Sequence, residues 1–169
     1  DGPYTVNPVS GALGAEISGI DLGAELDDYL VAELRRALLE YGVIFFRDQH
    51  LDTDAHKLLA KKFGEIFVHP FFVYGDDPEV VTIVREPGDT RIVGEDWHID
   101  TAMMPEPPMG AIMVAIEVSD YGGDTLFANQ YLAYIKAANS DHLLNGQIES
   151  LTGYLKETNT SLATIPQID

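Results

Sequence analysis

The chain has 169 residues, the length of one domain, and its 10 basic and 28 acidic residues give a formal net charge of −18. Such a charge repels phosphate backbones and anionic headgroups, so nucleic acids and membranes are excluded as expected partners. The absence of cysteine excludes disulfides and thiolate metal sites, and it fits the cytoplasmic location that we expect.

The first third of the chain predicts short strands and two helices. From Tyr4 to Leu22, β-type runs alternate with glycines, as in extended segments joined by tight turns. Helices are predicted from a cap at Asp27 or Asp28 to Gly42 and from a cap at Asp52 or Thr53 to Gly64, with a buried strand at Val43–Phe46 between them. The positions expected to face the core are Leu30, Leu34, Leu38 and Tyr41, then Leu58, Leu59 and Phe63.

The middle of the chain predicts mainly strands. Apolar or β-branched runs at Val80–Val84, Trp97–Thr101 and Met109–Val118 are typical of strands, and a turn follows at Gly122 and Gly123. A further helix is predicted at Tyr131–Ala138. Helices that come early and strands that dominate later favour an α+β fold with a mainly antiparallel sheet.

His98 and Asp100 are the most informative residues, because side chains two positions apart on a strand leave from the same face. A nitrogen and an oxygen donor without sulfur suit Fe(II), Mn or Zn, and two histidines with one carboxylate are typical of non-haem Fe(II) oxygenases. Taken alone, the spacing more often marks a hydrogen-bonded pair at an exposed strand end. Trp97 and Ile99 are expected to anchor the opposite face in the core, and Asp96 and Glu95 are either hydrogen-bond acceptors behind the metal ligands or solvated acids.

A second element, Gly122-Gly123-Asp124-Thr125, combines a tight turn with a hydroxyl group. Paired glycines let the backbone turn sharply and bring Thr125 to the start of a strand. An ordinary hairpin turn is the alternative interpretation of this element taken by itself.

Together these motifs resemble the family of taurine dioxygenase and 2,4-dichlorophenoxyacetate dioxygenase. The resemblance runs from about Val9 to about Ala138, with the motifs in the same order as in the family. The segments that carry it are Gly14–Leu22, Val43–Gln49, Phe63–Glu65, His69–Pro70, Trp97–Thr101, Gly110–Ile112, Gly122–Phe127 and Ala133–Tyr134.

The resemblance implies a double-stranded β-helix, a jelly-roll of the cupin type with flanking helices. It implies Fe(II) as cofactor, 2-oxoglutarate as cosubstrate and O2, with hydroxylation of a small organic substrate and release of succinate and carbon dioxide. His98 and Asp100 would be the first two metal ligands, and Thr125 would bind a 2-oxoglutarate carboxylate.

The resemblance also places three residues at the substrate. His69 matches the family histidine that contacts the acidic group of the substrate, while Phe72 and Gly94 stand where the family has Tyr and Asn. Both replacements remove hydrogen-bonding groups, so we expect a sulfonate or carboxylate other than taurine, or a more apolar small acid. The remaining histidines, His50, His56 and His142, are expected at the surface.

The family's third metal ligand, a distal histidine, and its 2-oxoglutarate-binding arginine are absent from this chain. We therefore expect residues 1–169 to be the N-terminal part of one dioxygenase domain that is inactive by itself, and a homo-oligomer is compatible with the family. A non-catalytic β-barrel that binds a small carboxylate is the alternative. A hydrolytic zinc enzyme that uses the same two ligands would give Gly122–Thr125 no role.

Overall fold

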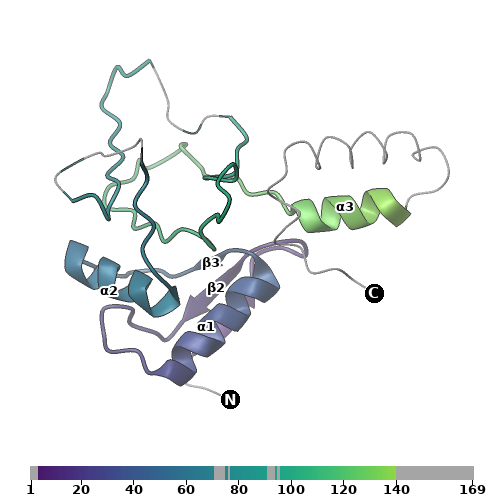
Figure 1. Cartoon of the computed structure of the whole chain (residues 1–169), viewed down its shortest axis with the longest axis horizontal. Helices are drawn as coiled ribbons and strands as arrows, with labels where there is room; N and C mark the ends of the chain where they lie inside the picture. Colours follow the sequence, from purple (N-terminus) through teal and green to yellow (C-terminus); the bar gives the residue numbers. More distant parts are fainter. Residues whose placement is uncertain (1–3, 71–74, 76, 91–93, 95, 140–169) are drawn as a thin grey trace. The chain divides into compact units, whose positions relative to one another are not determined.

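The computed structural model describes residues 4–70, 75, 77–90, 94 and 96–139. Contacts divide the chain into two compact units, which we call the first unit (Asp1–Thr82 with Ile112–Asn129) and the second unit (Ile83–Ala111 with Gln130–Asp169). No helix in the described ranges is long and apolar enough to cross a membrane. The elements in chain order (Figure 1) are β1 (Thr5–Pro8), β2 (Ala15–Ser18), α1 (Asp28–Tyr41), β3 (Ile44–Phe45), α2 (Thr53–Phe63) and α3 (Gln130–Asn139).

The sheet of the first unit is small and mixed, in the order β1-β2-β3. β1 and β2 are antiparallel, with Thr5 opposite Ser18, and the hydroxyl oxygens of these two residues lie 2.6 Å apart. β2 and β3 are parallel, with Ala15 opposite Ile44, and α1 forms the crossover between them. Where the sequence predicts a mainly antiparallel sheet, this small sheet is mixed: its longer pairing, β1 with β2, is antiparallel, and its shorter one, β2 with β3, is parallel because β2, α1 and β3 make one βαβ unit.

Both long helices begin and end where the sequence predicts. The Asp27 carboxylate accepts a hydrogen bond from the amide of Leu30 at 2.7 Å, and Gly42 ends α1 with a φ of +72°. The Asp52 carboxylate caps α2 through the amide of Ala55 at 2.8 Å. α3 also confirms the helix predicted at Tyr131–Ala138.

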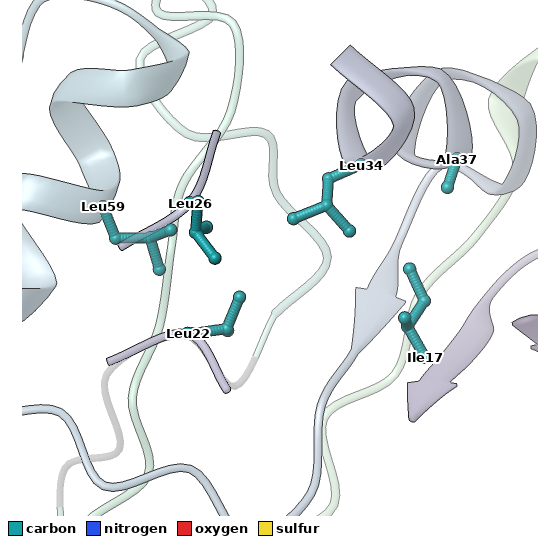
Figure 2. Close-up of a cluster of buried hydrophobic side chains, with 6 residues drawn as sticks. All are labelled: Ile17, Leu22, Leu26, Leu34, Ala37 and Leu59. Carbon is teal, nitrogen blue, oxygen red and sulfur yellow. The ribbon is translucent and has the colours of Figure 1, made fainter. Parts of the chain in front are cut away.

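The core of the first unit lies between the sheet and the two helices, and Figure 2 shows its buried side chains. Leu34 on α1 is only 1% exposed. The prediction for Leu58 was wrong, because this side chain is 65% exposed while Leu59 is buried. Adjacent helical residues point about 100° apart, so only one of these leucines can face the core. The buried residues are Ile17, Leu22, Leu26, Leu34, Ala37 and Leu59.

The strands predicted at Val80–Val84, Trp97–Thr101 and Met109–Val118 are irregular segments in this structure. A strand exists only where a second segment pairs with its amides and carbonyls, and no described segment pairs with these three. Burial nevertheless alternates from Ile112 to Ala115, the period of an extended chain with one covered face. The described part of the chain thus combines helices with a small sheet, and the jelly-roll stays a prediction.

We expect Leu34→Ala to lower the free energy of unfolding by about 3 kcal/mol, because it removes a buried side chain and leaves a cavity. Urea unfolding followed by circular dichroism would measure this loss. Leu39→Ala on the same helix is the control, since Leu39 is 72% exposed. Equal losses in the two variants would contradict the placement of the core.

Candidate metal centre

His98 and Asp100 lie in contact within the second unit. The imidazole Nε2 is 3.3 Å from a carboxylate oxygen of Asp100, and the two side chains are 54% and 73% exposed. The two side chains therefore meet, as the sequence predicts, but they do not do so by sharing one face of a strand. Residues 97–99 are irregular, and a turn at Asp100 and Thr101 brings the carboxylate to the imidazole.

The other ring nitrogen of His98 shows which way the imidazole is set. Nδ1 lies 2.7 Å from the backbone carbonyl of Asp96, and only an N–H can donate to that oxygen. This bond assigns the proton of a neutral imidazole to Nδ1 and turns the lone pair of Nε2 toward Asp100. The lone pairs of Nε2 and the Asp100 carboxylate then face each other, an arrangement that becomes favourable when a cation, either a proton or a metal ion, lies between them.

The spacing of the two donor atoms fits a metal ion. Nitrogen and oxygen ligands lie roughly 2.1 Å from a first-row divalent metal, so two neighbouring ligands of an octahedral ion are about 3.0 Å apart. The observed 3.3 Å between Nε2 of His98 and Oδ1 of Asp100 is close to this value. Within the described residues no group of three His, Cys, Asp or Glu side chains could hold a metal.

Gly94 lies against the imidazole. It adopts a φ of +80°, and a Cβ atom there would come within 3.3 Å of Cε1 of His98. Any other residue would therefore strain the backbone and press on the ring. The sequence analysis predicts Gly94 at the substrate; the structure places it beside a candidate metal ligand.

Thr101 follows the pair in a conformation that β-branched residues rarely adopt, with a φ of +52°. Its hydroxyl oxygen is buried and has no hydrogen-bond partner in the part of the chain that the structure describes. Sequence reasoning missed this residue, because a threonine in a predicted strand gives no signal of a positive φ. Backbone strain of this kind concentrates at functional sites.

Trp97 and Ile99 do not anchor a core, contrary to the prediction, since they are 70% and 55% exposed. The described residues of the second unit contain no buried hydrophobic side chain against which they could pack. An extended segment buries a face only when a second layer covers that face.

Thr125 belongs to the first unit and is exposed. Gly122 and Gly123, which have φ values of +73° and +74°, make the predicted turn, and the Ser119 hydroxyl lies 3.0 Å from the carbonyl of Gly122. The prediction that a strand begins at Thr125 was wrong, because the segment that follows this residue is irregular.

Two contacts attach the segment after Thr125 to the sheet of the first unit and to the connection between β1 and β2. The Phe127 ring meets Phe45 of β3 edge to face with ring centroids 6.1 Å apart. The side-chain amide of Asn129 donates to the carbonyl of Ala12 at 2.7 Å. The Thr125 hydroxyl is thus carried by a segment that is fixed at its C-terminal end.

His69 also belongs to the first unit, where it is half-buried and its ring lies edge-on to Phe67 at 5.9 Å. The predicted substrate residue Phe72 lies outside the described residues. Of the predicted metal, cosubstrate and substrate residues, the described part of the chain brings His98 into contact with both Asp100 and Gly94.

The other histidines differ in their surroundings. His50 is exposed, as predicted, and lines an open hollow of about 650 Å³ with Asp21 and Arg47. His56 is half-buried, contrary to the prediction, and its Nε2 lies 2.9 Å from the carbonyl of Ile112. The Ile112 side chain packs against the core of the first unit, so His56 contacts a part of the chain that is partly buried. His142 lies outside the described residues.

Comparison with known proteins relates residues 5–143 to the model of the taurine catabolism dioxygenase TauD, TfdA family. The chain is 35% identical over 130 residues to an alpha-ketoglutarate-dependent sulfate ester dioxygenase of Pseudomonas putida, covering 76% of this chain and 42% of that protein. It is 34% identical over 143 residues to an (S)-phenoxypropionate/alpha-ketoglutarate-dioxygenase of Delftia acidovorans, and this match covers 76% of this chain and 47% of that protein. The crystal structure of a taurine dioxygenase from Burkholderia xenovorans is 40% identical, covers 40% of this chain and 25% of that chain, and has a TM-score of 0.39. The chain therefore spans less than half the length of these relatives.

The geometry around His98 leads to a metal-binding prediction. We expect Gly94→Ala to weaken Mn(II) binding by about tenfold, because the new methyl group displaces the imidazole. Gly88→Ala is a matched control, since Gly88 also has a positive φ but no atom within 4 Å of its added Cβ. Titration of the complete protein with Mn(II), followed by electron paramagnetic resonance, would measure both affinities. Equal affinities in the two variants would contradict a metal site at His98.

Proposed function

The chain belongs to the TauD, TfdA family of taurine catabolism dioxygenases, and from this membership we propose that its complete protein is an Fe(II)- and 2-oxoglutarate-dependent dioxygenase. The proposed reaction hydroxylates a small organic substrate and releases succinate and carbon dioxide. The observation that carries the proposal is the contact of His98 Nε2 with the Asp100 carboxylate, with Nδ1 held by the Asp96 carbonyl.

In this proposal His98 and Asp100 hold the iron, and the Asp96 carbonyl keeps the imidazole in the tautomer that binds it. Bound Fe(II) supplies the oxidising chemistry, in which O2 and 2-oxoglutarate are consumed. The Thr125 hydroxyl donates a hydrogen bond to a carboxylate of 2-oxoglutarate. The third metal ligand and a cation for the far carboxylate are assigned to the part of the relatives that this chain does not cover.

The proposed substrate joins a small anionic group to an apolar body. Relatives at 35% and 34% identity are named for sulfate esters and phenoxypropionate, which both fit this description. We assign the anionic group to the His69 imidazole. Phe72 and Gly94 provide no side-chain hydrogen bond, so an apolar body is favoured over taurine, whose ammonium group needs polar partners.

We propose further that residues 1–169 are the N-terminal part of one jelly-roll domain. The alternating burial of residues 112–115 supports a strand with one face already covered. Met113, between the half-buried Ile112 and Val114, is 74% exposed, as expected of a strand whose other face meets a second layer. A cytoplasmic location and a homo-oligomer stay predictions.

The activity itself is the first test. Complete protein supplied with Fe(II), 2-oxoglutarate, O2 and hexyl sulfate is expected to release succinate faster than it does without hexyl sulfate. His98→Ala is expected to reduce this release by at least roughly a hundredfold, since it removes a metal ligand. His50→Ala, at an exposed histidine of the first unit, should leave it unchanged. Hexyl sulfate, pentanesulfonate and phenoxypropionate would be compared as substrates. Binding of 2-oxoglutarate without succinate release from any of them would instead favour a non-catalytic carboxylate-binding domain.

The role of Thr125 has its own test. Thr125→Val keeps the shape of the side chain but removes the hydroxyl, so we expect the KM for 2-oxoglutarate to rise by about tenfold, the usual effect of losing a hydrogen bond to a charged group. The KM for hexyl sulfate should be unchanged. Thr90→Val is the control at an exposed threonine. A rise in both KM values, or in neither, would remove Thr125 from the cosubstrate site.

A further inference from the structure

The sheet of the first unit carries an aromatic side chain on the face that points away from the core. Ile44 and Phe45 are the two residues of β3, and adjacent residues of a strand point to opposite faces of their sheet. Ile44 packs against the core between the sheet and the helices, so Phe45 points to the other face. The half-buried Phe45 ring is therefore left for contacts outside that core.

Gly14 and Phe127 both lie against this ring. Phe127 meets it edge to face, with the ring centroids 6.1 Å apart and the ring planes inclined by 67°. Gly14, in the connection between β1 and β2, has a φ of +88°, and a Cβ atom there would come within 3.2 Å of Cε2 of Phe45. Room for the ring therefore depends on the absence of a side chain at Gly14. We call Gly14, Phe45 and Phe127 the aromatic anchor.

A hydrogen bond binds the same segment to the same connection. The side-chain amide of Asn129 donates to the carbonyl of Ala12 at 2.7 Å. The connection is itself held in shape, because the Ser10 hydroxyl accepts a hydrogen bond from the amide of Ala12 at 3.3 Å and the amide of Gly14 donates to the carbonyl of Tyr41 at 2.8 Å. The segment is thus bound to an ordered part of the first unit.

Thr125 lies midway between the anchor and the glycine turn. The Ser119 hydroxyl donates to the carbonyl of Gly122 at 3.0 Å and so stabilises that turn. Thr125 is two residues from Gly123 and two from Phe127, and two residues of chain span at most about 7 Å. The Thr125 hydroxyl therefore cannot move far while the turn and the anchor are both in place.

From these contacts we propose that the aromatic anchor is a positioning device for 2-oxoglutarate, because it fixes to the sheet the backbone that carries the Thr125 hydroxyl. This inference rests on the proposed function, in which that hydroxyl donates to a carboxylate of the cosubstrate. Residues 119–129 all belong to the first unit and are all described, so the chain runs without a gap from the Phe127 contact to Thr125. Thr125 is exposed, which leaves its hydroxyl accessible to a ligand.

Loss of the Phe127 ring lengthens the free stretch of chain beside Thr125. The segment is then held on that side by Asn129, four residues from Thr125 instead of two, so the span doubles to roughly 14 Å. The hydroxyl can then lie in more places, and fixing it on the cosubstrate costs more conformational entropy. An edge-to-face ring pair is worth roughly a two- to tenfold change in an equilibrium constant, so the expected effect is moderate.

Binding of 2-oxoglutarate to the complete protein would test the proposal. With Mn(II) in place of iron and oxygen excluded, we expect Phe127→Ala to raise the Kd of 2-oxoglutarate by about fivefold in isothermal titration calorimetry. In turnover the KM for 2-oxoglutarate should rise by the same factor, while kcat and the KM for hexyl sulfate stay unchanged. Phe127→Tyr should restore the Kd, because it keeps the ring. Leu126→Ala is the matched control, at a neighbouring side chain that is 72% exposed.

A double-mutant cycle with Thr125→Val shows whether the anchor acts through the hydroxyl. If it does, Phe127→Ala changes the Kd of 2-oxoglutarate little once the hydroxyl is gone, so the two effects do not add. Phe45→Leu removes the same ring contact from the side of the sheet and is expected to raise the Kd by a similar factor. It takes the place of Phe127→Ala if circular dichroism shows that Phe127→Ala does not fold.

The outcomes separate the two proposals. An unchanged Kd in Phe127→Ala would overturn the positioning role, and so would a fivefold rise that persists in full in the Thr125→Val background. A parallel rise in the KM for hexyl sulfate would also overturn it, since that would indicate a general structural role. The expected cycle without succinate release from the unsubstituted protein would instead overturn the proposed reaction and leave the role of the anchor standing. Absence of 2-oxoglutarate binding would overturn both.

Discussion

Pairing of backbone amides and carbonyls decides which parts of this chain are regular. β2 lies between β1 and β3, with partners on both sides, and α1 returns the chain to the same sheet. The core forms against that sheet, from Ile17 to Leu34 and Leu59. Residues 109–118 are as apolar as a strand, and Ile112 and Val114 are half-buried, but no described segment pairs with them. Hydrophobicity selects the face that is buried, while the partner decides whether a strand forms.

The candidate metal centre follows a different physical rule, because its geometry needs only local contacts. One backbone carbonyl, that of Asp96, orients the His98 ring, and a turn at Asp100 brings the carboxylate to the free nitrogen. A neutral imidazole and a carboxylate facing each other at 3.3 Å gain from a cation between them. This local geometry is what makes the pair a candidate site for a cation.

Features that depend on neighbouring residues could be predicted from the sequence. Asp27, Gly42 and Asp52 bound the helices because a capping carboxylate and a glycine act on the nearest amides and carbonyls. The His98–Asp100 contact could be predicted because two positions are close in any extended or turning chain. The ion pairs of Lys57 and the bond of His56 could not, since they join segments 20 and 56 residues apart. The positive φ of Thr101 could not be predicted either, because β-branched residues rarely adopt such a backbone conformation.

The acidity of the chain shapes how it can bind an anion. Of its few cations, Arg36 is paired with Glu33, Arg47 with Glu16, and Lys57 with two carboxylates. A cation that already has a carboxylate partner attracts a ligand anion weakly, because the ligand must compete with that partner. Anionic ligands are then best held by groups that a surrounding carboxylate does not neutralise, such as a bound metal ion or a hydroxyl like that of Thr125. Those are the groups that the proposed function uses to hold 2-oxoglutarate.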